Sequence, residues 1–190
     1  GTIPADFSSA TFFLAAGELP GNDVTVHGLD MDDVQGDEKV VEYLRAMGAS
    51  IDITPNPLGG HILRVKGGYL SGCELDLNAT PDALPMMAVL ACFAKGETRL
   101  VNVPQARLKE TDRIAVMRQE LEKLGAHVQE LPDGLVIQES PLHAAHVDGH
   151  GDHRVVMALA VGATATHGHT IIHGAEAVSV TYPEFVNTLA

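Results

Sequence analysis

The residues that could do chemistry gather where the sequence predicts helices to begin. Asp82 follows a proline at the start of an apolar stretch, and Asp152-His153-Arg154 directly precedes another. The densest group is the run 107–113, Arg-Leu-Lys-Glu-Thr-Asp-Arg, which opens an amphipathic segment. Because a helix start carries unpaired N–H groups and the positive end of the helix dipole, it attracts anions. Arginine binds phosphate and carboxylate through paired hydrogen bonds, so this placement predicts a site for an anionic ligand.

Basic residues are concentrated at these predicted helix starts. The chain has 190 residues, only 12 of them Lys or Arg, and a formal net charge of −13. Four of the 12 lie at predicted helix starts: Arg107, Lys109, Arg113 and Arg154. An acidic chain that places its few cations in this way is expected to collect an anion, such as a phosphate or a carboxylate.

The same residues also allow simpler interpretations. Asp82 could do no more than complement the helix dipole. Thr111 and Asp112 could be helix caps. Glu110 could form a solvated ion pair with Arg113, worth less than ~1 kcal/mol. The triplet at 152–154 is harder to explain in this way, because charges beside a buried helix need partners.

A repeated pattern predicts the helices that would position these residues. Residues 38–47 have apolar side chains at helical spacing, stop at Gly48 and run into short strands at 51–53 and 62–65. The pattern recurs 77 residues later. There a helix at 113–124 stops at Gly125 and precedes strands at 127–129 and 135–138.

Three further segments are apolar on nearly every side, at 9–16, 83–94 and 155–165. Helices of this kind are buried all round. Each is followed by a glycine and a strand, predicted at 24–26, 98–103 and 170–172, and a short helix is predicted at 183–189. We therefore expect an α/β fold of repeated helix-strand-helix-hairpin units, with buried helices surrounded by sheets, forming one domain over 1–190. An ordinary α/β sandwich is the alternative.

Composition excludes several classes of protein. The charge of −13 argues against a nucleic-acid or membrane-surface protein, because phosphates would repel it. The longest apolar runs, 83–94 and 155–163, are too short to span a bilayer. Cys73 and Cys92 form no pair signature, which favours a reducing compartment, and we expect a cytoplasmic location. No signal peptide is recognised, and a chain that opens without Met suggests a fragment.

Seven histidines between His143 and His173 raise the question of a metal site. They match no ligand pattern with cysteine and no His-Glu-x-x-His motif, so no metal and no cofactor is expected. The stretch 143–150 contains Asp148 and Gly149 and follows Pro141 closely, so it is predicted to be a loop.

These motifs, in this order, resemble the C-terminal half of the EPSP synthase (3-phosphoshikimate 1-carboxyvinyltransferase) family. The resemblance spans essentially all 190 residues. It rests on the following motifs: Asp6-Phe7-Ser8-Ser9-Ala10, Pro81-Asp82-Ala83, the run 107–113, Leu124-Gly125-Ala126, Asp152-His153-Arg154 and Thr181-Tyr182-Pro183.

The resemblance implies a fold and a reaction. Family members have two similar domains, each with three repeated units whose helices pack inside sheets. They transfer the enolpyruvyl group of phosphoenolpyruvate to the 5-hydroxyl of shikimate 3-phosphate and release phosphate, in the shikimate pathway that leads to aromatic amino acids. The reaction passes through a tetrahedral intermediate in the cleft between the domains and uses no metal. Glyphosate inhibits it.

By this resemblance, two carboxylates would be catalytic. Asp82 would hydrogen-bond the shikimate hydroxyls and accept a proton, and Glu110 would exchange protons with the methylene carbon of phosphoenolpyruvate. This assignment is chemically sensible, because protonating an enol ether carbon needs a positioned acid and activating a hydroxyl needs a base.

Five other residues would bind substrate by the same resemblance. Arg113 and Arg154 would hold the carboxylate and phosphate of phosphoenolpyruvate, with His153 beside them. Lys109 would contact the shikimate phosphate, and Gln105 stands where the family often has asparagine. Clustered cations would both bind the anions and stabilise developing charge.

Two departures from the family pattern limit the expectation. The N-terminal half, which in the family supplies a catalytic lysine and further arginines, is absent, so that half is an expected partner and the isolated domain is expected to be inactive. Val180 stands where known members have a lysine. The alternatives are a transferase that acts on UDP-N-acetylglucosamine, or a non-catalytic half-domain that binds anions or assembles with another chain.

Overall fold

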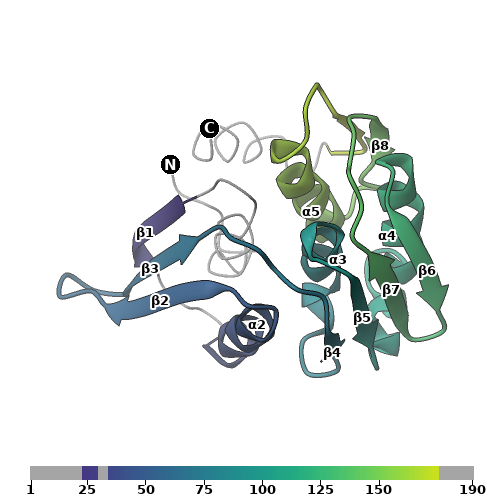
Figure 1. The fold of residues 1–190 in the computed structure, drawn as a ribbon. Coiled ribbons are helices and arrows are strands. Elements are labelled where there is room, and N and C mark those ends of the chain that lie inside the picture. The colour runs from purple at the N-terminus through teal and green to yellow at the C-terminus, as the bar shows by residue number, and fades with distance from the viewer. Residues whose placement is uncertain (1–22, 30–33, 176–190) are drawn as a thin grey trace.

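The computed structural model describes residues 23–29 and 34–175, which form sheets around helices (Figure 1). The helices predicted at 9–16 and 183–189 lie outside the described residues, as does Val180. The first and last motifs of the family resemblance lie outside them too.

The first described unit is a three-stranded antiparallel sheet with one helix against it. β1 (Asp23–Leu29) pairs with β3 (His61–Lys66), and β3 pairs with β2 (Ser50–Pro55). α2 (Val34–Ala46) packs on β2 through the apolar side chains that the sequence places at helical spacing. Gly48 has φ +97°, which favours glycine, and it lets the chain leave the helix and enter β2. The predicted helix and both predicted strands of this unit are confirmed.

Two helices are buried on all sides, as predicted. α3 (Leu84–Phe93) is buried from Leu84 to Cys92, and α5 (His153–Thr164) is buried from Val155 to Gly162. The first turn of the predicted 83–94 helix is a separate 3-10 turn, η1 (Pro81–Ala83). Because both helices carry apolar side chains all round, neither has a face that could remain in water.

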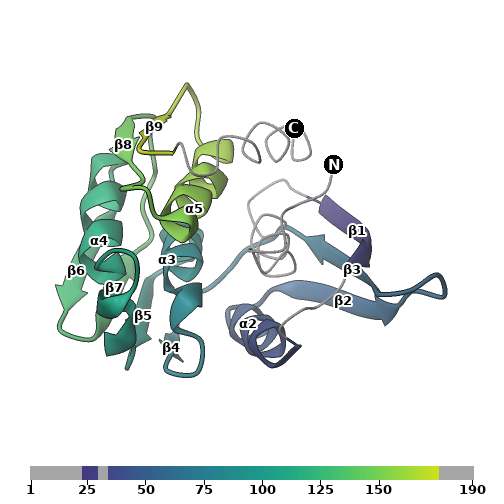
Figure 2. The ribbon, with the colours of Figure 1, turned by 180° about the vertical axis from the view of Figure 1, so that it is seen from behind.

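The three helices of the second half lie side by side in both views (Figures 1 and 2). α4 (Arg113–Lys123) contacts both α3 and α5, and α3 contacts α5. α3 and α5 approach closely at Gly162, where a Cβ would lie 3.1 Å from Val89 Cγ1. Small side chains at such positions let helix axes come close together.

A mixed four-stranded sheet covers α3 and α4, in the order β4-β5-β7-β6. β4 (Glu74–Asp76) is parallel to β5 (Glu97–Val101), whereas β5 pairs with β7 (Gly134–Gln138) and β7 with β6 (His127–Leu131) in antiparallel fashion. The predicted hairpin after α4 is therefore confirmed. The chain connects β5 to α4 through a second 3-10 segment, η2 (Pro104–Leu108).

The prediction that 143–150 is entirely loop is wrong. It contains β8 (His146–Asp148), which pairs in parallel with β9 (Ile171–His173) against α4 and α5. A strand of three residues is too short to show an alternating pattern, and its partner lies more than 20 residues away in the sequence.

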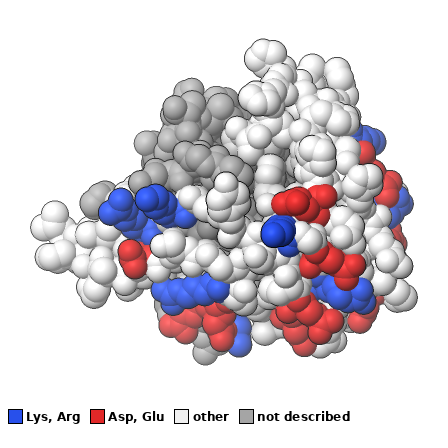
Figure 3. Space-filling view, viewed as in Figure 1, with Lys and Arg blue, Asp and Glu red and all other residues white. Residues whose placement is uncertain are grey.

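Buried side chains from all of these units join in one continuous apolar core. Among the described residues no helix combines the length and the apolar character needed to cross a membrane. Figure 3 shows acidic and basic side chains interspersed on the face that Figure 1 presents.

Candidate active site

The starts of the three helices η1–α3, α4 and α5 meet at Asp82. Its Oδ1 lies 3.0 Å from Arg113 Nη1 and 3.4 Å from Lys109 Nζ, and its Oδ2 lies 3.7 Å from Arg154 Nη2. These side chains come from η1, from the segment before α4, and from the first turns of α4 and α5. Three of the four cations that the sequence places at predicted helix starts, Lys109, Arg113 and Arg154, therefore lie together around Asp82.

Arg113 is buried at the centre of this cluster, with 3% of its side chain exposed. It donates to Asp152 through two atoms, with Nε 2.9 Å from Oδ2 and Nη2 3.1 Å from Oδ1. It also donates to Asp82 and to Glu110, which is three residues earlier. Arg113 therefore donates four hydrogen bonds to three carboxylates.

Asp152 joins the start of α5 to the start of α4. Its side chain is fully buried and accepts from Arg113, from Thr111 Oγ1 at 2.9 Å and from the backbone N–H of Arg154 at 3.0 Å. Burial raises the pKa of Asp152, but the hydrogen bonds from Arg113 and Thr111 and the Arg113 charge outweigh burial and hold the pKa below its usual value. The carboxylate therefore stays ionised and caps α5 while it orients Arg113.

The simpler readings hold for part of the run 107–113. Asp112 is the N-cap of α4 and accepts from the N–H of Ala115 at 3.1 Å. Thr111, by contrast, donates to Asp152 instead of capping the helix. Glu110 does pair with Arg113, and 63% of its side chain is exposed, so it is free to turn toward a ligand.

The interpretation of Arg107 as an anion-collecting residue at a helix start is wrong. α4 begins only at Arg113, and Arg107 lies at the end of η2. Its guanidinium donates to the carbonyls of Leu131 and Pro132, both at 2.8 Å, and to Glu130 at 2.9 Å. It also bonds Asp112 at 2.9 Å. Arg107 therefore ties the β6–β7 turn to the start of α4.

The other two predicted binding residues border the cluster. His153 is the first residue of α5 and is exposed. Gln105 lies on η2, where its Nε2 is 3.4 Å from the carbonyl oxygen of Asn78. Its Oε1 is buried without a hydrogen-bond partner among the described residues. The binding roles of both residues stay predictions.

The charges of this helix-start cluster balance one another. Three carboxylates (Asp82, Glu110 and Asp152) face three cations (Lys109, Arg113 and Arg154). Two of the carboxylates, Asp82 and Glu110, are 46% and 63% exposed and bond the same guanidinium, so a ligand between them could meet an acid and a base together. An incoming anion would find cations whose charge is already compensated.

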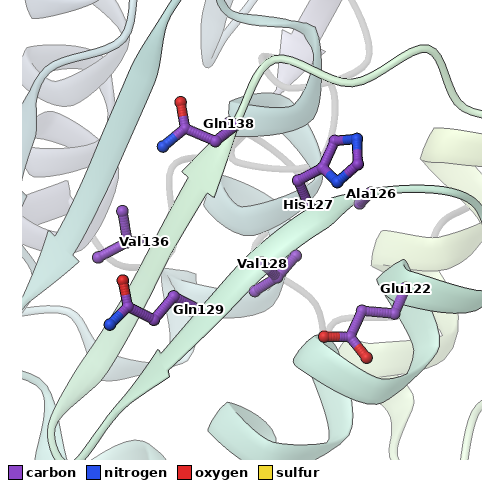
Figure 4. Close-up of a pocket in the computed structure, with 7 residues that line it drawn as sticks. All are labelled: Glu122, Ala126, His127, Val128, Gln129, Val136 and Gln138. Carbon is purple, nitrogen blue, oxygen red and sulfur yellow. The ribbon is translucent and has the colours of Figure 1, made fainter.

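A separate hollow of about 440 Å³ lies on the β6–β7 hairpin (Figure 4). Its lining includes His127, Gln129 and Gln138 from the strands and Glu122 from α4. None of the residues in the helix-start cluster lines it, and neutral amide and apolar side chains dominate its wall. The hollow therefore adds nothing to the chemistry at Asp82.

Across residues 23–29 and 34–175, no three His, Cys, Asp or Glu side chains are grouped to hold a metal ion. The rings of His146 and His173 stack with centroids 5.4 Å apart, and Nδ1 of His146 lies 3.1 Å from Nε2 of His173.

Comparisons with known proteins match nearly the whole chain. The family model described as EPSP synthase (3-phosphoshikimate 1-carboxyvinyltransferase) matches residues 1–189. A 3-phosphoshikimate 1-carboxyvinyltransferase of Ruminiclostridium cellulolyticum is 56% identical over 188 residues, which cover 99% of this chain and 43% of the relative. The corresponding protein of Acetivibrio thermocellus is 54% identical over 189 residues, covering 100% of this chain and 44% of the relative.

Solved structures agree with the sequence relatives. An EPSP synthase from Acinetobacter baumannii superposes with a TM-score of 0.83 at 27% identity, covering 95% of this chain and 44% of that one. The enolpyruvyl transferase NikO from Streptomyces tendae gives a TM-score of 0.74 at 19% identity, covering 95% of this chain and 41% of that one, which shows a shared fold. The chain spans less than half the length of each of these proteins.

Proposed function

The chain belongs to the EPSP synthase family, and we propose that it is the C-terminal half of a 3-phosphoshikimate 1-carboxyvinyltransferase. The observation that carries this proposal is the meeting of Asp82, Lys109, Arg113 and Arg154 at three helix starts. Family membership alone would not place these side chains within reach of one another. Their convergence supports a half-site for two phosphorylated substrates.

The two exposed carboxylates divide the proton transfers in this proposal. Glu110 delivers a proton to the methylene carbon of phosphoenolpyruvate, and Asp82 accepts the proton of the 5-hydroxyl as its oxygen bonds the neighbouring carbon. Loss of phosphate from the tetrahedral intermediate restores the carbon–carbon double bond and gives the enol ether product. In this step a methyl proton returns to Glu110, and the proton held by Asp82 passes to the departing phosphate. Their common neighbour Arg113 supports the two roles, because it places both carboxylates beside one reacting centre before Glu110 turns toward the substrate.

The cations bind the substrate anions in this proposal. Lys109 and Arg154, each with about a third of the side chain exposed, contact the anions directly. Arg113 reaches the phosphoenolpyruvate anion when Glu110 turns away from it, and His153 borders the same anion. Gln105 donates through its amide Nε2, which lies 3.4 Å from the Asn78 carbonyl oxygen, on the shikimate phosphate side.

The proposal requires a second half. Because the charges of the helix-start cluster already balance, the cluster has no surplus of positive charge for substrates that carry several negative charges. The missing N-terminal half, more than half the length of each relative, would supply it. The continuous core supports a single domain over 1–190, and two free thiols agree with a cytoplasmic location.

The test is phosphate release from phosphoenolpyruvate and shikimate 3-phosphate. The isolated chain is expected to give no turnover, and a separately expressed N-terminal half, taken from the Ruminiclostridium cellulolyticum relative, is expected to restore it. UDP-N-acetylglucosamine in place of shikimate 3-phosphate is expected to give none. Turnover with the nucleotide sugar alone, or robust turnover by the isolated chain, would overturn the proposal.

A further inference from the structure

The turn between β8 and α5 has an uncommon backbone conformation. His150 has φ +55° and Gly151 follows with φ +69°. Non-glycine residues rarely adopt positive φ, and His150 is one of only two that do so in the described part of the chain. This turn leads directly into Asp152 and Arg154 of the helix-start cluster. A conformation of this kind persists only where neighbouring contacts enforce it.

Several hydrogen bonds hold this turn: Asp148 Oδ1 accepts the His150 N–H at 2.6 Å, and the Gly151 N–H donates to the Gly174 carbonyl at 2.9 Å. The contact that reaches it from another element of the helix-start region comes from a buried glutamate on α4. Glu120 has 1% of its side chain exposed, at a position of the helix that otherwise faces the core. Its Oε1 accepts the backbone N–H of Asp148 at 2.7 Å, and its Oε2 lies 3.2 Å from His150 Nε2. A carboxylate can only accept, so His150 Nε2 carries the proton in this contact.

Glu120 is held ionised by its neighbours. Burial raises the pKa of Glu120, but hydrogen bonds from Lys123, the Asp148 amide and His150 outweigh burial and lower the pKa. Lys123 Nζ is 2.7 Å from Oε1 and half exposed, so the buried charge is paired toward the solvent side. A buried carboxylate with this many hydrogen-bond partners restricts the positions of the groups that donate to it, here the Asp148 amide and the His150 ring.

Side chains of α4 therefore bond the β8–α5 turn at two places. Arg113 holds Asp152 at one end, and Glu120 holds Asp148 and His150 about 10 Å further along the helix axis. We propose that Glu120 and His150 are positioning residues, which hold the β8–α5 turn so that Asp152 meets Arg113 and Arg154 meets Asp82. The part of this inference that concerns turnover rests on the proposed function, whereas the part that concerns the turn does not.

The first test measures backbone hydrogen exchange on the 190-residue chain itself. In Glu120→Ala, the amide of Asp148 loses its acceptor and is expected to exchange about tenfold faster or more, the factor for one lost hydrogen bond to a charged group. The amides of Gly151 and Arg154 keep their own acceptors and are expected to exchange faster only because the turn loosens. The amides of α3 are expected to keep their rates. Glu120→Gln, which still offers an oxygen to the Asp148 amide, is expected to restore most of the protection. Glu122→Gln is the control on the same helix, because the Glu122 carboxylate pairs with Arg118 at 3.2 Å and is 44% exposed.

A second variant separates positioning from a loss of stability. His150→Gly relieves the positive-φ requirement and removes the imidazole, so overall stability is expected to change little while the Arg154 amide loses protection. In the enzyme assembled with an N-terminal half, Glu120→Ala is expected to raise KM for phosphoenolpyruvate about tenfold, with a smaller change in kcat and rescue by Glu120→Gln.

These results distinguish the two proposals. Failure of the assembled wild-type enzyme to turn over would overturn the proposed function, while the exchange rates would still decide the positioning role. Unchanged turn amides in folded Glu120→Ala and His150→Gly, or equal acceleration across α3 and the turn, would overturn the positioning role.

Discussion

At the scale of single residues, the buried pair of Arg113 and Asp152 is the feature on which the cluster depends. Arg113 bonds three carboxylates, and Asp152 also caps α5. A charged pair without access to water is strongly destabilising when one partner is removed, because the other charge is then left uncompensated. The pair thus sets both the stability of the cluster and the direction of the Arg113 side chain.

Asp152→Asn is expected to lower the free energy of unfolding by about 3–5 kcal/mol, because Arg113 would remain buried without its ionised partner. Denaturant unfolding followed by circular dichroism measures this. Glu122→Gln, at a half-exposed pair on α4, is the matched control and should change stability by less than about 1 kcal/mol. Equal, small effects of both substitutions would show that the buried pair is not a stabilising anchor.

The same carboxylate predicts a dependence of stability on pH. The pKa of Asp152 is lower in the folded chain than in the unfolded chain, where it is about 3.9. The contribution of Asp152 is therefore complete above that pH and is lost as the pH falls through the folded pKa. The stability difference between wild type and Asp152→Asn, measured by urea unfolding, should be constant from about pH 5 to 7 and shrink below about pH 4. A difference that grows on acidification would contradict the assignment.

At the scale of helices and strands, the β6–β7 hairpin depends on a close backbone approach. A Cβ on Gly134 would lie 1.9 Å from the carbonyl oxygen of Leu100 on the neighbouring strand β5. The hairpin turn is in addition held by Arg107, which links it to the start of α4. The hairpin therefore takes part in placing the segment that carries Lys109 and Glu110.

Gly134→Ala is expected to destabilise the chain by about 1–3 kcal/mol, because the backbone of β5 cannot move aside as a side chain could. Gly68→Ala is the control, since a Cβ there meets nothing within 4 Å and its φ is not in the left-handed region. That substitution should be neutral or stabilise by about 0.4–1 kcal/mol. Thermal unfolding compares the two, and a Gly134→Ala variant as stable as Gly68→Ala would refute the close approach.

Elements with a strong local pattern could be predicted from the sequence. The all-apolar character of α3 and α5 predicts burial, and the repeat of α2 in α4 predicts a shared unit with its glycine stop. β8 could not be predicted, because its partner strand is distant and only three residues pair. The 3-10 segment η2 was likewise missed, and this displaced Arg107 from the helix start.

The types and the order of residues along the chain were sufficient to select most of the side chains that meet at the candidate site. They were not sufficient to predict which of these side chains hydrogen-bond one another. The sequence does not show that Arg113 donates hydrogen bonds to Asp152, because the two residues are 39 positions apart. The contact between Glu120 and His150 was not predicted, and His150 was considered only as one of seven histidines that could have held a metal. The available signal was a charged residue at a core-facing helix position, which needs a partner when buried.

At the scale of the whole molecule, charge and length together limit what the chain can do alone. It carries −13 overall, and its helix-start cluster has equal numbers of carboxylates and cations. If the proposed function holds, phosphoenolpyruvate has to approach a negatively charged molecule and displace existing ion pairs. Both effects weaken binding until another chain contributes positive charge and excludes water.

Phosphoenolpyruvate is accordingly expected to bind the isolated chain with a Kd no tighter than about 1 mM, an affinity of about −4 kcal/mol. Titration calorimetry at low ionic strength measures it, with the Arg154→Gln variant to identify the site. Addition of an N-terminal half should tighten binding. Micromolar binding by the isolated chain that Arg154→Gln abolishes would show that the second half is not needed for the anion.

The central claim is that three helix starts build half of an enolpyruvyl transfer site around Asp82. The most direct measurement is kcat for phosphate release by the enzyme assembled from this chain and an N-terminal half, with and without Asp82→Asn. The Asp82→Asn substitution is expected to lower kcat about 10²–10⁴-fold, the usual contribution of a positioned acid or base. Arg99→Gln, at a half-exposed arginine on β5 outside the cluster, should leave kcat unchanged. Full turnover by the Asp82→Asn enzyme would contradict the account.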